Sequence, residues 1–175
     1  MSQNSRSRRD RLIAAAEGYL ALDMPEHALR SLREVDDPDQ MLFAVNYLKG
    51  EALRQMEQYA EALEPLGRAF AENPDDIGLL MAMAWCHKRT NELPKAISAM
   101  EQAYRISPKQ AVILYNLACY WSLAGNKTQA LSWLGRALRM DRSLRKLIDD
   151  ETDFNPLRHD ADFQMIVSAL DSTTR

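Results

Sequence analysis

One phrase recurs four times along this chain at a spacing of 34 residues. It reads HALRSLREV, EALEPLGRA, KAISAMEQA and QALSWLGRA, and its alanines are Ala28, Ala62, Ala96 and Ala130. The residues four and seven places after each alanine are also apolar or small, so the three positions form one stripe on a helix. A period of roughly 20 to 50 residues is typical of repeat architectures, in which each unit needs its neighbours to bury its apolar face. This period constrains the fold more than any other feature of the sequence.

A second helix precedes the first in every copy. Twelve residues before each alanine stands another small residue: Ala16, Gly50, Ala84 or Ala118. A small side chain at the same place in each copy indicates that two helices approach closely there. The sequences LDMPE, MEQYA, TNELP and AGNKT between the helices are typical of turns. Pro74 and Pro108 end the second helices of the middle copies, because proline cannot continue a helix.

A 34-residue helix–turn–helix with small residues at positions 8, 20 and 27 and a proline at position 32 resembles the tetratricopeptide repeat. The resemblance covers four contiguous units, 9–42, 43–76, 77–110 and 111–142. It implies an all-α fold, a right-handed α-solenoid of helix–turn–helix repeats with one concave face. The first and last units lack the proline and have Gln40 and Arg142 instead, as expected for terminal repeats. The usual tryptophan of the fourth position is replaced in all units, by Leu12, Asn46, Leu80 and Leu114.

Two segments lie outside the period. Residues 1–8 are polar and rich in arginine, and we predict a flexible basic tail. Within residues 143–175, SLRKLIDD predicts a short helix, and a final amphipathic helix begins near Asp160, capped by Asp160 or Asp162. Its apolar side carries Phe163, Ile166, Val167 and Leu170. We expect these helices to cap the fourth repeat, since the end of a solenoid needs a cap, with docking of a partner or a second copy as the alternative.

The composition argues against several classes of protein. The formal net charge is −3, whereas a nucleic-acid-binding domain usually carries a basic excess. No stretch approaches the roughly 18 consecutive apolar residues of a membrane span, and no apolar segment with a cleavage site follows the N-terminus. The two cysteines, Cys86 and Cys119, are too few for a disulfide framework. The sequence therefore predicts a cytoplasmic protein that contacts neither nucleic acid nor the membrane interior.

Catalytic and cofactor-binding motifs are absent from the sequence, including a phosphate loop, HExxH and GxSxG. Cys86, His87 and Cys119 are metal-ligand types, but adjacent helical residues point about 100° apart and no fourth ligand has suitable spacing. Buried thiols are the favoured interpretation. The acidic run at 149–153 lacks the glycine of a calcium loop and predicts a solvated turn. We predict no enzymatic activity, no cofactor and no metal.

The resemblance implies that positions 2, 5, 9, 12 and 13 of each first helix line the concave face. From these positions we predict a partner-binding groove made of Glu17, Leu20, Tyr47, Glu51, Arg54, Met81, Trp85, Lys88, Arg89, Tyr115, Cys119 and Ser122. Tyr, Trp, Met and Arg are enriched in protein interfaces, so we expect a protein or peptide segment with apolar anchors. Packing of Met81 and Trp85 against a neighbouring helix is the alternative for single residues. The Lys and Asn with which some relatives grip a chaperone's C-terminal carboxylate are missing.

Two functions are compatible with these patterns. The favoured one is a non-catalytic interaction module, an adaptor or scaffold. A narrower form of it is a chaperone such as the small acidic tetratricopeptide proteins of type III secretion. The alternative is a homo-oligomerising structural protein that assembles through its terminal surfaces.

Overall fold

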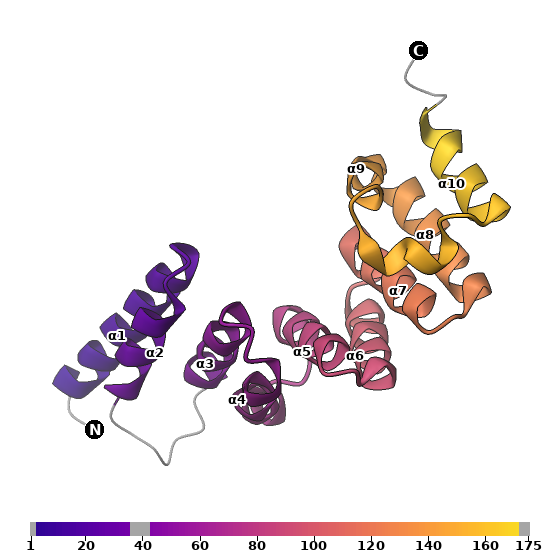
Figure 1. The fold of residues 1–175 in the computed structure, drawn as a ribbon. Helices are drawn as coiled ribbons and strands as arrows, with labels where there is room; N and C mark the ends of the chain where they lie inside the picture. Colours follow the sequence, from indigo (N-terminus) through magenta and orange to yellow (C-terminus); the bar gives the residue numbers. More distant parts are fainter. Residues whose placement is uncertain (1–2, 36–42, 172–175) are drawn as a thin grey trace. The chain divides into compact units, whose positions relative to one another are not determined.

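The protein was analysed as a computed structural model, which describes residues 3–35 and 43–171, with side chains from residue 8 to residue 169 within those ranges. The described residues form helices and no strand, which confirms the predicted all-α repeat fold. The chain divides into two compact units, Met1–Asn91 (unit 1) and Glu92–Arg175 (unit 2). Figure 1 shows the helices of both units coloured along the sequence. The division falls between the two helices of the predicted third repeat. Across the described part of the chain, every helix is too short or too polar to cross a membrane.

Unit 1 contains two complete helix pairs and the first helix of a third. Its helices are α1 (Gln3–Ala21), α2 (Pro25–Arg33), α3 (Phe43–Gln55), α4 (Tyr59–Glu72) and α5 (Ile77–Arg89). Each helix packs on the next, and α3 also touches α1 and α5, so these three first helices form one layer. Residues 3–8 belong to α1, which corrects the predicted tail, because neither glycine nor proline interrupts the helix there. The early turn predicted at 36–40 lies outside the described residues.

Unit 2 contains one helix pair, a preceding second helix and a C-terminal segment. Its elements are α6 (Leu93–Ile106), α7 (Ala111–Leu123), α8 (Lys127–Met140), the 3₁₀ helix η1 (Arg142–Leu144), α9 (Arg145–Ile148), the 3₁₀ helix η2 (Thr152–Leu157) and α10 (Ala161–Asp171). η1 and α10 pack on α8, whereas η2 packs on α7. Asp160 caps α10, since its Oδ1 accepts the backbone N–H groups of Asp162 at 3.0 Å and Phe163 at 3.2 Å. Phe163 is buried, Ile166 and Val167 are half-buried, and the side chain of Leu170 lies outside the described residues.

The repeated small residues lie in the core of both units, as the sequence predicts. Every alanine at these two repeat positions is fully buried: Ala16, Ala28, Ala62, Ala84, Ala96, Ala118 and Ala130. Gly50 occupies the place of an alanine in the second repeat. A Cβ atom there would lie 2.4 Å from Cγ and Cδ2 of Leu66, so only glycine fits without a shift of that leucine.

The turns inside the helix pairs repeat one backbone conformation with the same 34-residue period. Positive φ angles occur at Asp23 (56°), Glu57 (59°), Asn91 (62°) and Gly125 (72°). After Asp23, Glu57 and Gly125 the next residue's N–H donates to a carbonyl five residues back, at 2.9 to 3.0 Å, for example from Gln58 to Leu53. This is the Schellman ending of a helix, which needs one residue in the left-handed region. The sequence predicts turns here, and the structure adds that the left-handed residues Asp23, Glu57 and Asn91 are not glycine.

Candidate functional site

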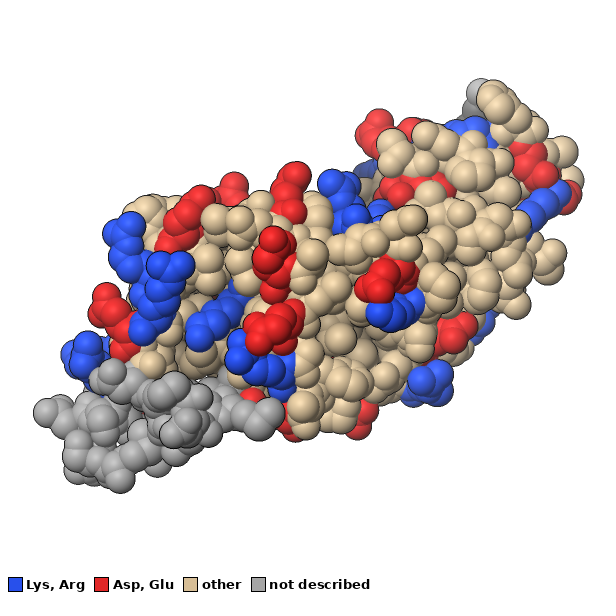
Figure 2. Space-filling model, turned by 60° about the horizontal axis from the view of Figure 1, so that its bottom comes forward, with Lys and Arg blue, Asp and Glu red and all other residues tan. Residues whose placement is uncertain are grey.

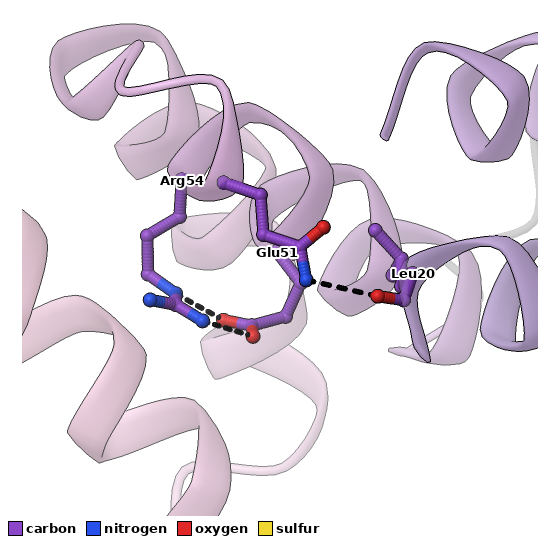
Figure 3. Close-up of polar contacts among 4 residues, drawn as sticks. Leu20, Glu51 and Arg54 are labelled. Atoms are coloured by element: carbon purple, nitrogen blue, oxygen red, sulfur yellow. Dashed lines mark hydrogen bonds and ion pairs between the residues drawn. The ribbon is translucent and has the colours of Figure 1, made fainter. Parts of the chain in front are cut away.

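The exposed face of α3 carries three of the predicted groove residues, Tyr47, Glu51 and Arg54, whose spacings of four and three place them on one side of the helix. Arg54 donates from Nε to Glu51 Oε1 at 2.9 Å and from Nη2 to Oε2 at 2.8 Å (Figure 3). Both side chains are half-buried, and the hydrogen bond to Glu51 raises the pKa of Arg54. This two-point pairing fixes both groups in one plane. The two opposite charges predicted here therefore act as one neutral, oriented pair.

Gln55 ties this face to the end of α1. Its Nε2 donates to the backbone carbonyl of Leu20 at 3.2 Å (Figure 3). Its Oε1 is buried and has no hydrogen-bond partner among the described residues. Leu20 is half-buried, and Glu17, one turn earlier on α1, is exposed. The predicted α1 residues thus lie at the border of the α3 face, with Glu17 in solvent.

Tyr47 is a half-buried phenol at the start of this face. Its ring stacks on Phe43 with centroids 5.7 Å apart, and its hydroxyl lies close over Gly78, where an added Cβ atom would be 3.0 Å away. Burial raises the pKa of Tyr47 to about 12, and the carboxylates of Glu51 and Asp76 add to the rise. Tyr47 therefore stays protonated at neutral pH and can donate a hydrogen bond beside its apolar ring.

The face of α5 contributes an aromatic and cationic pair. The Trp85 side chain is 39% exposed, and Lys88 Nζ lies 4.6 Å from its ring centroid. Such a cation–π contact orients the indole and the ammonium together. Met81 is half-buried on the same helix, whereas Arg89 is exposed with its guanidinium 4.9 Å from the ring of Tyr59 in α4. Trp85 and Lys88 are therefore the members of this helix best placed to meet a partner.

The three predicted groove residues of α7 have a different environment. Tyr115, Cys119 and Ser122 are only 3%, 2% and 1% exposed. η2 packs on α7 and places Phe154, which is fully buried, edge-on against the Tyr115 ring with centroids 5.7 Å apart. In this structure, the α7 part of the predicted groove is covered by the chain's own C-terminal segment.

The sequence predicts that residues 143–175 cap the fourth repeat, but it does not predict that residues 151–157 lie on the groove face of α7. Phe154 and Leu157 are both buried and are spaced by three residues, which is one turn of a 3₁₀ helix. That spacing in FNPL was the available signal, but the acidic residues before it favoured a solvated turn. The prediction of a solvated turn is correct for Asp149 and Asp150, which are exposed, and wrong for Asp153, which is buried.

One group of side chains in the described residues has ligand atoms close enough to hold a metal ion. Cys119, Glu151 and Asp153 each offer one ligand atom, and these atoms lie within 4.8 Å of one another. Structural zinc sites use four ligands, and Glu151 Oε1 already accepts the Asp153 backbone N–H at 3.1 Å. We therefore assign no metal to this group. In unit 1, burial raises the pKa of Cys86 to about 11, although Arg54 opposes the rise, so this thiol stays protonated at neutral pH.

The face drawn in Figure 2 carries charges of both signs and no large patch of one sign. Lys and Arg side chains are interspersed there with Asp and Glu. Mixed signs of this kind are ordinary for a soluble surface and do not form the basic stripe of a nucleic-acid-binding domain.

Residues 53–101 match the family model of the tetratricopeptide repeat. Superkiller protein 3 of Schizosaccharomyces pombe is 29% identical over 113 residues, which are 61% of this chain and 8% of that protein's length. The structure of Pseudomonas aeruginosa pilF superposes with a TM-score of 0.78 at 16% identity, over 97% of this chain and 76% of that chain. YrrB, a TPR protein with an unusual peptide-binding site, superposes with a TM-score of 0.71 at 21% identity, over 79% of this chain and 72% of that chain. These two solved structures share the fold of this chain.

Proposed function

Because residues 53–101 match the tetratricopeptide repeat and the chain shares the fold of solved TPR structures, we propose that unit 1 binds a segment of a partner protein on the face that α3 and α5 expose. The observation that carries the proposal is Trp85, a large aromatic side chain that is 39% exposed on a helix face and held in place by Lys88. Exposed aromatic side chains that are already oriented bind with little loss of conformational freedom, and they dominate interface energies.

The neighbouring groups suit an extended or helical peptide with apolar anchors. Tyr47 offers an apolar ring with a hydroxyl donor, and the Glu51–Arg54 pair offers a fixed polar border. YrrB, which shares the fold, is a TPR protein with a peptide-binding site. The proposed role is that of a non-catalytic adaptor or chaperone-like module. The cytoplasmic location and the absence of a cofactor belong to the same proposal.

Site-specific photo-crosslinking in cells tests this function. A photo-reactive amino acid placed at position 85 is expected to crosslink a partner protein, and the crosslinked peptide identifies the bound segment. Leu22 is a matched control, since it is an apolar side chain that is 71% exposed in the turn between α1 and α2. Equal crosslinking from positions 85 and 22, or none from either, would contradict binding on the α3–α5 face.

A second candidate function is self-assembly through the C-terminal elements. Three large apolar side chains are exposed there, Met140, Leu147 and Met165. Exposed apolar groups near the end of a repeat array are suitable contacts for another copy. Sedimentation at two protein concentrations distinguishes the candidates, because a constant monomer mass argues against assembly and a mass that rises with concentration supports it.

A further inference from the structure

The α7 face of unit 2 is covered by a segment of the same chain, residues 151–157. Tyr115, Cys119 and Ser122 stand at the same repeat positions as Met81, Trp85 and Lys88 in unit 1, 34 residues earlier. Residues 151–157, which include the 3₁₀ helix η2, pack on this helix: Phe154 lies against the Tyr115 ring, and the ligand atoms of Glu151 and Asp153 lie within 4.8 Å of Cys119 Sγ. The contact is an aromatic anchor inserted beside acidic residues, and it shows what kind of segment this face accepts.

The resident segment covers the face without satisfying its polar groups. Tyr115 Oη and Ser122 Oγ are buried and have no hydrogen-bond partner among the described residues. A buried polar atom without a partner loses its bonds to water and gains nothing in return. Burial also raises the pKa of Tyr115, so the phenol keeps its proton and remains a donor without an acceptor. A segment that supplied acceptors to these two hydroxyls would bind the same face better than the resident one.

The segment is attached by buried side chains, Phe154, Leu157 and Asp153, and by polar contacts that are exposed or partly buried. Its aromatic anchor is Phe154, which packs between Tyr115 and Phe163 at centroid distances of 5.7 and 5.5 Å. On the N-terminal side of η2, Arg158 Nη2 donates to the backbone carbonyls of Asp149 at 2.8 Å and Glu151 at 2.9 Å.

On the C-terminal side, Lys127 of α8 holds the cap of α10. Its Nζ lies 2.6 Å from Asp160 Oδ2 and 2.8 Å from Asp162 Oδ2, with side chains that are partly or largely exposed. Exposed ion pairs contribute little to stability. Phe154, the one aromatic side chain of the segment, is therefore the residue whose replacement we expect to weaken the contact with α7 most.

We propose that the face of α7 is a second peptide-binding surface, closed in this structure by residues 151–157, and that it opens when an acidic partner segment with an aromatic anchor replaces them. The proposed partner shares the chemistry of the resident segment, an aromatic side chain in the place of Phe154 preceded by a carboxylate in the place of Asp153. The proposal concerns unit 2 alone, so it does not depend on binding by unit 1.

Cysteine alkylation measures the opening directly, because Cys119 lies under the segment and Cys86 is a matched buried thiol in unit 1. The full chain is treated with N-ethylmaleimide, and both sites are followed by mass spectrometry. Phe154→Ala is expected to speed alkylation of Cys119 by about tenfold or more and to leave Cys86 unchanged, since only a local opening is affected. Leu134→Ala is the control, because it removes a fully buried side chain of unit 2 that lies outside the segment. Equal acceleration of Cys119 by the two variants would overturn the proposal.

Replacement is then tested with a peptide added in trans. A synthetic peptide with the sequence of residues 149–159, DDETDFNPLRH, is added to the Phe154→Ala protein. We expect it to restore protection of Cys119, whereas the same peptide with alanine in place of phenylalanine does not. Protection by neither peptide, or by both equally, contradicts recognition through an aromatic anchor. If Phe154→Ala unfolds unit 2, Phe154→Leu replaces it, since leucine keeps an apolar side chain and removes only the ring.

Discussion

The faces of α5 and α7 occupy the same place in consecutive repeats and differ in what covers them. Trp85 on α5 is 39% exposed, whereas Cys119, 34 residues later on α7, is 2% exposed. The repeat fixes the direction in which each side chain points, because the helices of both units bury the same small and apolar positions. Exposure of the side chain depends in addition on what the chain places over the face. After the last repeat, no further repeat follows in the period, and residues 151–157 fold back onto α7 instead.

The largest effects on stability are expected from substitutions in the two cores, and we expect them to be equal in the two units. Leu66 in unit 1 and Leu134 in unit 2 are both fully buried at the same repeat position. We expect Leu66→Ala and Leu134→Ala each to lower the free energy of unfolding by about 2–5 kcal/mol, through lost burial and the cavity left behind. Denaturant unfolding followed by hydrogen exchange of α4 and α8 peptides measures the two losses separately. A loss of stability in only one unit would show that the two cores are not equivalent. The faces of α5 and α7 could then not be compared as equivalent positions.

Gly50 offers a smaller test of the same equivalence. Gly50→Ala introduces a Cβ atom 2.4 Å from Leu66 Cγ, so we expect a loss of about 1–3 kcal/mol in unit 1 through overpacking. The double variant with Leu66→Ala is expected to recover part of that loss, since the obstructing side chain is gone. Thermal unfolding of the single and double variants measures this coupling. Strictly additive losses would mean that Leu66 already moves aside freely.

Substitutions at the left-handed turn residues are expected to change the stability of the two units in opposite directions. Glu57 has a φ of 59° in the left-handed region, where a residue with a Cβ is strained, so Glu57→Gly is expected to stabilise unit 1 by about 1 kcal/mol. Gly125 has a φ of 72° at the matching turn of unit 2, and Gly125→Ala is expected to destabilise it by about 1 kcal/mol. Chemical denaturation with unit-specific hydrogen exchange checks both signs. Equal signs for the two changes would contradict a common turn geometry.

Periodicity was sufficient to predict the fold and the core, because burial of Ala28, Ala62, Ala96 and Ala130 follows from packing between neighbouring repeats. The resemblance to the tetratricopeptide repeat, rather than the period itself, put Trp85 among the groove positions, and that residue is 39% exposed. Periodicity could not predict the cover on Tyr115, since that depends on a contact between α7 and a segment about 40 residues later that lies outside the period. The left-handed turn residues were missed for a related reason. Asp23, Glu57 and Asn91 lack the glycine that usually marks such a position.

The smallest expected effect concerns the pH dependence of the α10 cap, which follows the segment that covers α7. The hydrogen bond from Lys127 lowers the pKa of Asp160, as do the N–H groups of Phe163 and Asp162. Its carboxylate therefore stabilises the α10 cap above the unfolded-state pKa, and this stabilisation is lost as the pH falls through the lower folded-state pKa. We expect hydrogen exchange in α10, corrected for intrinsic rates, to accelerate below about pH 4. Asp160→Asn should remove this dependence, whereas Asp141→Asn should retain it, since the pKa of Asp141 is also lowered, but by Ser143 in η1. If hydrogen exchange in α10 of the Asp160→Asn variant still accelerated at low pH, another titrating group would be responsible for the effect.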